Sequence, residues 1–318
     1  MKLVICEKPS VAKAVASALG VTSRVDGCFE GNGLIVSWCV GHLVSPMDAA
    51  GYDPGYKKWK YDDLPILPEP FRYVLAKGKE DAFQNLKRLM DREDVTELVN
   101  ACDAGREGEL IFRLVYEMAG CRKPFSRLWI SSMEDAAIRE GFQNLRPGAE
   151  YDPLYQSALC RQKADWLIGI NATRLFSVLY HRTLNVGRVQ TPTLAMLVDR
   201  DWKISSFKKE KYHHVRLALD GAEAVSEKIA APEEAEALRA ACTGAAVTCT
   251  TVTREQKKEN PPKLYDLTSL QREANRLFGY TAKQTPDYAQ ALYEKKLLTY
   301  PRTDSRYLTA DMAESASA

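Results

Sequence analysis

A tyrosine and an arginine lie two residues apart near the end of the 318-residue sequence, in the loop Tyr300-Pro301-Arg302. A phenol has a reference pKa of about 10, so at neutral pH it attacks phosphorus only where its surroundings favour phenolate character. Arg302 can provide this, because guanidinium is always charged and its planar fork matches phosphate oxygens. The pattern is typical of a nucleophile beside a phosphate, although a Tyr-Pro-Arg loop is more often a surface turn.

Carboxylates follow two apolar stretches that read as strands. Residues 98–102 run into an acidic, glycine-bearing turn with Asp103 and Glu107, and the strand 3–6 ends on Glu7. In an α/β sheet, ligands gather at the carboxyl ends of parallel strands, where carboxylates suit a hard cation such as Mg²⁺. Together with a lysine and the tyrosine loop, this acidic cluster indicates phosphoryl transfer on a nucleic acid.

Seven stretches in one order carry a family resemblance. They are 7–10 (Glu-Lys-Pro-Ser), 40–43 (Val-Gly-His-Leu), 103–109, 127–132 (Arg-Leu-Trp-Ile-Ser-Ser), 165–171, 187–194 and the Tyr300 loop. In this order and spacing the sequence resembles the type IA DNA topoisomerases, most closely the topoisomerase III branch. The resemblance covers essentially the whole sequence but only about the first half of a typical member, so we expect a truncated form.

The resemblance implies a catalytic role for four residues. Tyr300 would attack a DNA phosphodiester, form a 5′-phosphotyrosyl link and release a 3′-hydroxyl, while Arg302 would stabilise the charge on the phosphate. Lys8 would assist the leaving oxygen or steady the phosphate, with pairing beside Glu7 as the plain alternative. Glu7 would act in acid-base exchange or hold the metal.

The resemblance also implies Mg²⁺ held by Glu7, Asp103 and Glu107. The usual family pattern is Asp-x-Asp-x-Glu, and here its middle acid is Gly105. Water or Glu109 would then have to compensate, since Mg²⁺ commonly keeps several waters.

DNA contacts are implied at positions that match the family: Arg161, Asp165, Arg188, Gln190, Thr191 and His42. The window from Arg161 to Arg216 holds eleven Lys or Arg against four Asp or Glu, as expected of a face that meets a polyanion or of a solvated helical surface. For His42 we favour a buried structural role over direct catalysis. The loop 185–192 reads equally as a helix start ahead of Pro192.

Composition sets the bounds. The chain is 45% hydrophobic and 27% charged, with a net charge of +2, and is long enough for two or three domains. Nothing resembles a signal peptide or reaches membrane-spanning length. The eight cysteines show no C-x-x-C spacing, which favours reduced thiols in a cytoplasmic protein and no zinc site.

The expected fold class is α/β with additional α and β segments. Alternating strands and helices predict a Rossmann-like parallel sheet that resembles the Toprim domain. The expected divisions are the Toprim domain (1–150), the first helical segment of the DNA-groove domain (151–216), the first segment of a β-rich hinge (217–262) and the start of the helical domain that carries the tyrosine (263–318).

Local patterns predict individual elements. Strands are expected at 34–40, 97–102, 215–219 and 246–252, and helices from a Ser10 cap to Gly20, at 106–119, from a Ser131–Glu134 capping box to 145, at 232–242, at 267–277 before Gly279, and from Thr285-Pro286. In the helical region the core candidates are Leu159, Ala164, Leu167, Ile168, Leu194, Leu197 and Val198.

The whole enzyme implied by the resemblance is an ATP-independent, monomeric topoisomerase in the cytoplasm at the nucleoid. It would act on single-stranded and negatively supercoiled DNA, by relaxation or decatenation, with a helicase as a candidate partner. Two other classes compete with this hypothesis. A Toprim nuclease or primase would share Glu7 and Asp103 but has no use for Tyr300, and a non-catalytic remnant would bind single strands without cleaving them.

Overall fold

The computed structural model describes residues 1–130, 133–295, 297–301 and 305–308. The chain divides into two compact units, one formed by residues 1–188 and 263–318 and the other by residues 189–262. The four domain divisions expected from the sequence stay a prediction. In the described part of the chain, no helix combines the length and apolar character needed to cross a membrane.

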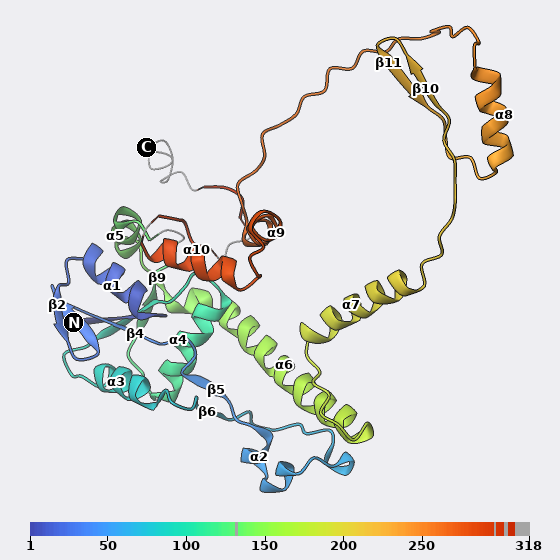
Figure 1. Cartoon of the computed structure of the whole chain (residues 1–318). Helices are drawn as coiled ribbons and strands as arrows, with labels where there is room; N and C mark the ends of the chain where they lie inside the picture. The colour runs from blue at the N-terminus through green and yellow to red at the C-terminus, as the bar shows by residue number, and fades with distance from the viewer. Residues whose placement is uncertain (131–132, 296, 302–304, 309–318) are drawn as a thin grey trace. The chain divides into compact units, whose positions relative to one another are not determined.

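The first unit is built on a sheet with the strand order β2-β3-β4-β1-β7-β8-β9 (Figure 1). The strands are β1 (Lys2–Cys6), β2 (Ser23–Val25), β3 (Cys28–Gly31), β4 (Leu34–Trp38), β7 (Glu97–Ala101), β8 (Phe125–Arg127) and β9 (Arg146–Pro147). Neighbouring strands from β4 through β1 and β7 to β8 pair in parallel, whereas the pairs β2–β3, β3–β4 and β8–β9 are antiparallel. The predicted α/β class is therefore confirmed, with antiparallel strands added at both edges.

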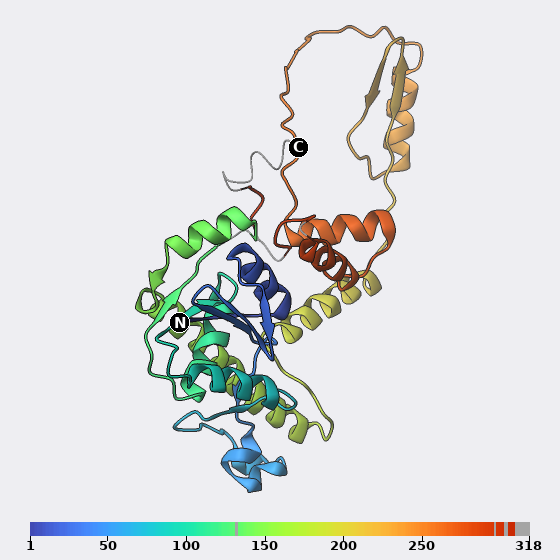
Figure 2. The ribbon, with the colours of Figure 1, turned by 90° about the vertical axis from the view of Figure 1, so that its left-hand side faces the viewer.

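Helices cover both faces of this sheet (Figures 1 and 2). They are α1 (Pro9–Ala18), α3 (Glu80–Met90), α4 (Arg106–Met118), α5 (Asp135–Gln143) and the long α6 (Asp152–Leu179). Alternate residues of β1 point to opposite faces, as the two-residue repeat of a strand requires. Leu3 and Ile5 pack with α3, α4 and α6, and Val4 and Cys6 pack with α1 and α5.

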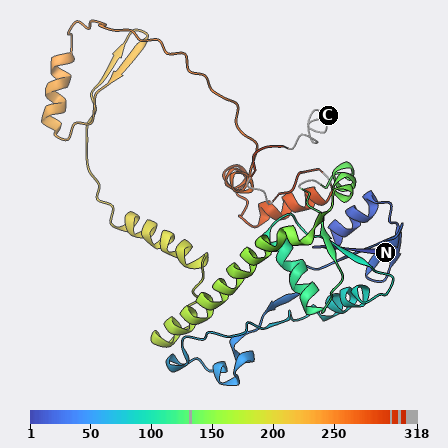
Figure 3. The ribbon, with the colours of Figure 1, turned by 180° about the vertical axis from the view of Figure 1, so that it is seen from behind.

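A lobe between β4 and α3 lies against α6 (Figure 3). It contains β5 (Val44–Pro46), α2 (Ala49–Tyr52), two short 3-10 helices at Pro54–Lys57 and Tyr61–Asp63, and β6 (Tyr73–Leu75). Asn171 of α6 accepts a hydrogen bond from Ile66 N at 2.6 Å and donates to Ile66 O at 3.0 Å. Trp166 Nε1 donates to Met47 O at 3.1 Å. The 165–171 motif therefore clamps the lobe onto α6.

The segment that carries Tyr300 returns to the first unit after the second one. It contains α9 (Leu267–Phe278) and α10 (Gln284–Glu294). Asp266 caps α9 through Ser269 N, and Gly279 ends it at φ 69°, a left-handed conformation that glycine adopts at no steric cost. The predicted helix at 267–277 is confirmed. Arg306 forms an ion pair with Asp266 at 2.8 Å and holds the pKa of that carboxyl below its usual range.

The second unit contains α7 (Gln190–Ser205), β10 (Arg216–Leu219), β11 (Ala222–Val225) and α8 (Pro232–Cys242). The predicted strand at 246–252 is wrong, because these residues form no strand. Strand β10 pairs with β11. The two strands are joined by Asp220-Gly221, with Gly221 at φ 72°, and such a two-residue turn favours pairing between adjacent segments.

Three further expectations need correction. Helix α1 begins at Pro9 with Lys8 as its N-cap residue, so Ser10 lies inside the first turn; proline suits that position because its missing N–H would have no helical partner. Glu134 is the N-cap residue of α5, and Ser131 of the expected capping box lies outside the described residues. The core prediction fails for several apolar residues that are more than half exposed: Ile168, Leu194, Leu197 and Val198.

The clamp between Asn171 and Ile66 generates a stability prediction. We expect Asn171→Ala to lower the free energy of unfolding by about 1–3 kcal/mol, because the N–H and the carbonyl of buried Ile66 each lose their hydrogen bond to Asn171. Asn144→Ala is the control, since exposed Asn144 bonds a single carbonyl, and we expect a change within about 0.5 kcal/mol. Urea unfolding of both variants provides the measurement, and equal losses would contradict the clamp.

Candidate active site

The carboxyl ends of β1 and β7 bring two predicted site residues to one edge of the sheet. The strands are adjacent and parallel, with Cys6 opposite Ala101, so Glu7 and Asp103 follow neighbouring strand ends. Glu7 is 9% exposed and Asp103 is partly buried. Lys8 comes next as the N-cap residue of α1. The edge therefore combines acids and a lysine, as expected from the sequence.

Tyr300 contacts this edge directly. Its hydroxyl donates a hydrogen bond to Asp103 Oδ2 at 2.7 Å, across 197 positions of sequence. The ring of Tyr293, on α10, meets the Tyr300 ring edge-on with centroids 5.6 Å apart. Burial, and then the charge of Asp103, raises the pKa of Tyr293. Tyr293 is thus kept as a neutral phenol, whereas the Tyr300 hydroxyl is hydrogen-bonded to a carboxylate. Arg302 lies outside the described residues.

Glu107 stands at the outer side of the site, in the first turn of α4. Its side chain is 58% exposed, and its carboxylate lies 3.4 Å from His42 Nε2 and 3.8 Å from Arg161 Nη1. His42 has a side chain that is 42% exposed. The favoured interpretation of His42 as a buried structural residue is therefore wrong, because it follows Gly41 onto the surface beside α4 rather than entering the core.

Ion pairs continue from Glu107 along α6. Arg161 lies 4.0 Å from Asp165, and Asp165 lies 2.8 Å from Arg188 Nε. Hydrogen bonding to Asp165 raises the pKa of Arg188. Three of the residues expected to contact DNA thus belong to one series of ion pairs that starts at Glu107. Two others, Gln190 and Thr191, begin α7 in the second unit and are exposed.

The acids fit Mg²⁺ held with water rather than in a protein cage. Within the described residues, no three His, Cys, Asp or Glu side chains come together as a metal site. Mg²⁺ is often bound by one or two carboxylates and several waters. Asp103 keeps a second carboxylate oxygen beside the one that Tyr300 contacts, and Glu107 is accessible to solvent. These two carboxylates therefore suit such an ion.

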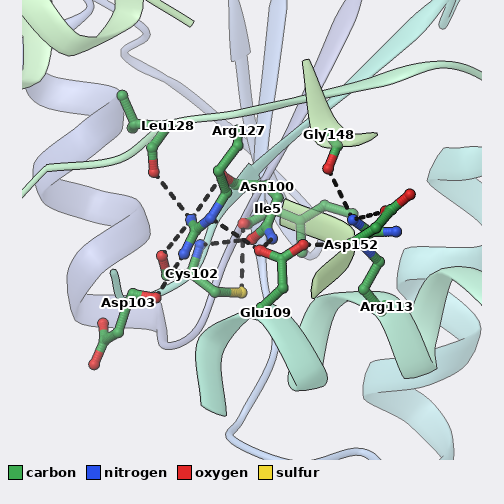
Figure 4. A network of polar contacts seen from close by, with 10 residues as sticks. All are labelled: Ile5, Asn100, Cys102, Asp103, Glu109, Arg113, Arg127, Leu128, Gly148 and Asp152. Atoms are coloured by element: carbon green, nitrogen blue, oxygen red, sulfur yellow. Dashed lines mark hydrogen bonds and ion pairs between the residues drawn. The ribbon is translucent and has the colours of Figure 1, made fainter. Parts of the chain in front are cut away.

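Glu109 cannot replace the acid missing at position 105. Its side chain is fully buried, and it accepts hydrogen bonds from Asn100 Nδ2 and Arg113 Nε, both at 2.9 Å. It also pairs with the fully buried Arg127 (Figure 4). Sequence reasoning missed this cluster, although Glu109 and Arg113 stand four residues apart on either side of the apolar run 110–112, a spacing typical of an ion pair.

Two family profiles match successive stretches of the sequence. A DNA topoisomerase family profile matches residues 149–318, and a Toprim domain profile matches residues 2–133. DNA topoisomerase 3 of Shouchella clausii is 44% identical over 99% of this chain. The DNA topoisomerase 3 of Bacillus subtilis is 43% identical over 98% of it. The chain spans 44% of the length of each of these relatives.

A structural comparison agrees with them. The structure of full-length topoisomerase I from Thermotoga maritima matches 99% of this chain with a TM-score of 0.68 and 26% sequence identity. The match covers 51% of that protein. The likeness therefore extends over the sheet, the helices and the tyrosine segment of the present chain.

Gly105 generates a prediction about the metal. It is the N-cap residue of α4 in an extended conformation (φ −176°), and an added Cβ would meet nothing within 4 Å. Gly105→Asp therefore fits without strain; we expect tighter Mg²⁺ binding and a stability gain of a few tenths of a kcal/mol from capping. Gly105→Asn is the control, because it caps without adding charge. Calorimetric Mg²⁺ titration checks this, and equal affinities for the two variants would contradict a metal beside residue 105.

Proposed function

The chain belongs to the type IA DNA topoisomerase family, and on this premise we propose that it carries the strand-cleaving centre of a topoisomerase III. The observation that supports this most directly is the 2.7 Å hydrogen bond between the Tyr300 hydroxyl and Asp103. A nuclease or primase built on the same Toprim acids needs no tyrosine at this point. The contact therefore favours covalent catalysis by Tyr300.

The chemistry exchanges one ester for another. Tyr300 Oη forms a bond to the phosphorus of a DNA phosphodiester, and the bond between phosphorus and the 3′-oxygen breaks. The phenol proton passes toward the carboxylate of Asp103, and the leaving oxygen takes a proton at the Glu7–Lys8 edge. Since the phosphotyrosyl ester stores the energy of the broken phosphodiester bond, resealing requires no ATP.

Cations of the chain would handle the phosphate charge. Arg302 follows Tyr300 by two residues, and Lys8 is the N-cap residue of α1, at the end of the helix where the dipole favours anions. Asp103 and Glu107 are the residues that would hold Mg²⁺, with Glu7 beside them. When bound, Mg²⁺ would screen the phosphates while the strand bends and reseals.

The strand would approach along α6. Arg161 and Arg188 are partly exposed and each is paired with the carboxylate of Asp165, which leaves guanidinium edges for phosphate oxygens. His42, Gln190 and Thr191 are proposed as further contacts. We propose a single-stranded substrate for this path, because a row of cations that follows one backbone is typical of proteins that bind single strands.

The activity of the whole protein extends this proposal. We expect relaxation of negatively supercoiled DNA or decatenation by a monomer in the cytoplasm, at the nucleoid and with a helicase as a candidate partner. Strand passage would need a gate that opens and closes, a conformational cycle rather than a single chemical step. The rival hypothesis of a non-catalytic remnant predicts binding of single strands with no cleavage at any Mg²⁺ concentration.

Substitution of the two tyrosines that meet edge-on tests the nucleophile. We expect Tyr300→Phe to abolish the covalent adduct with a labelled single-stranded oligonucleotide, because no other hydroxyl takes over. Tyr293→Phe is the matched control: it contacts the same ring but is held neutral by burial, so the adduct should persist within a few-fold of the original level. Denaturing gel electrophoresis detects the adduct. Persistence of the adduct in the Tyr300→Phe variant would refute Tyr300 as nucleophile.

A further inference from the structure

We propose that Arg127 is a positioning residue for this site, acting through the main chain that carries Asp103. The inference rests on the proposed function, because it explains how Asp103 is kept where Tyr300 and a cation can both meet it. Arg127 ends β8 and is 0% exposed. It therefore touches no substrate and works entirely from beneath the site.

The guanidinium of Arg127 bonds the carbonyls around the end of β7 (Figure 4). Nη1 lies 2.6 Å from Cys102 O, 2.9 Å from Leu128 O and 3.0 Å from Asn100 O. Nη2 donates to Asp103 O at 2.6 Å. Three of these four acceptors belong to the end of β7 and the turn that leads into α4, so a single planar group fixes the backbone that presents the Asp103 carboxylate.

A buried charge of this kind needs a partner, since an isolated one would cost many kcal/mol. Arg127 Nε lies 3.1 Å from Glu109 Oε2, in a geometry that makes the contact an ion pair rather than a hydrogen bond. Burial lowers the pKa of Arg127, but an arginine starts from a pKa above about 12 and stays charged at neutral pH. Glu109 thus holds the guanidinium in place.

The pair is anchored in turn to α6. Arg113 donates from Nε to Glu109 at 2.9 Å and from Nη2 to Gly148 O at 2.9 Å, and it pairs with Asp152 at 2.8 Å. Asp152 is the first residue of α6. The turn that carries Asp103 is therefore tied through Arg127, Glu109 and Arg113 to the helix along which the DNA strand is proposed to lie.

Gly108 packs directly against the same carbonyl. A Cβ at this position would lie 2.2 Å from Asp103 O and 2.9 Å from Asp103 N, closer than real atoms approach. Any side chain at 108 would displace the Asp103 backbone. The carbonyl of Asp103 is thus enclosed between a donor that pulls it inward and a glycine that permits the approach.

Lysine at position 127 separates positioning from simple packing. It keeps the charge and most of the apolar stem, but its three donors radiate from one nitrogen and cannot replace a planar fork. The matched control is Arg174→Lys. Arg174 is 4% exposed and donates to Tyr56 O at 2.8 Å, in the lobe on α6 rather than at the Asp103 turn.

The experiment compares both variants with the unmodified protein. One measurement is the Mg²⁺ concentration that gives half of the Mg²⁺-induced rise in melting temperature; the other is the Mg²⁺ concentration for half-maximal oligonucleotide adduct. We expect Arg127→Lys to require ~10–100-fold more Mg²⁺ in both, the range found when residues that orient metal ligands are changed. Arg174→Lys should lower the melting temperature without altering the Mg²⁺ requirement.

The outcomes are distinguishable. Equal Mg²⁺ requirements for the two lysine variants overturn the positioning role. If the unmodified protein forms no Tyr300-dependent adduct, the proposed function fails, while the melting measurement still decides the role of Arg127. Should Arg127→Lys not fold, Gly108→Ala provides the second variant, because its added Cβ would displace the same carbonyl. It should raise the Mg²⁺ requirement in the same way, and an unchanged requirement overturns the proposal.

Discussion

The site rests on a charged cluster beneath the β7–α4 turn, in which Arg127 and Glu109 are fully buried. Two arginines, Arg113 and Arg127, are balanced by Glu109 and Asp152, so the cluster is close to neutral. A buried ion pair contributes little net stability when compared with well-packed apolar residues, but removing one partner leaves an uncompensated charge. Such a cluster contributes mainly by fixing geometry, because each N–H donor forms a good hydrogen bond only when its acceptor lies within a narrow range of positions. It holds the backbone of Asp103 while leaving its carboxylate available for chemistry.

The contact between Tyr300 and Asp103 has the opposite character. It is a hydrogen bond at the edge of the sheet, made by a segment that is otherwise held by α9, α10 and the Arg306–Asp266 pair. A hydrogen bond to a charged group contributes about 1.5–3 kcal/mol, which thermal motion can break and remake. A firmly held acid and a phenol that can be released would suit the strand-cleaving role proposed above, in which the tyrosine must leave and regain the acid.

Local patterns in the sequence predicted much of the fold, and the family resemblance was needed for the site. Short apolar runs marked β1 and β7, and apolar residues at helical spacing followed by Gly279 marked α9, because these signals are set by neighbouring residues. The pairing of β10 with β11 was missed although Asp220-Gly221 signals it. Burial of α7 was wrongly expected. Apolar residues at helical spacing indicate that one face of a helix would be stabilised by packing, but they do not say which residues pack against it. The meeting of Tyr300 with Asp103 joins residues 197 positions apart, beyond any local rule.

The two acids of the proposed metal site differ in how tightly they are held, and the difference bears on Gly105. Asp103 is carried by a fixed backbone, whereas Glu107 is exposed and shared between His42 and Arg161. Exposed ion pairs contribute about 0–1 kcal/mol, so Glu107 can exchange these partners for a cation at little cost. With glycine at 105, that position supplies no third carboxylate to the proposed site. A cation at the proposed site would therefore meet one acid on a fixed backbone, Asp103, and one exposed acid, Glu107, whose present contacts are weak.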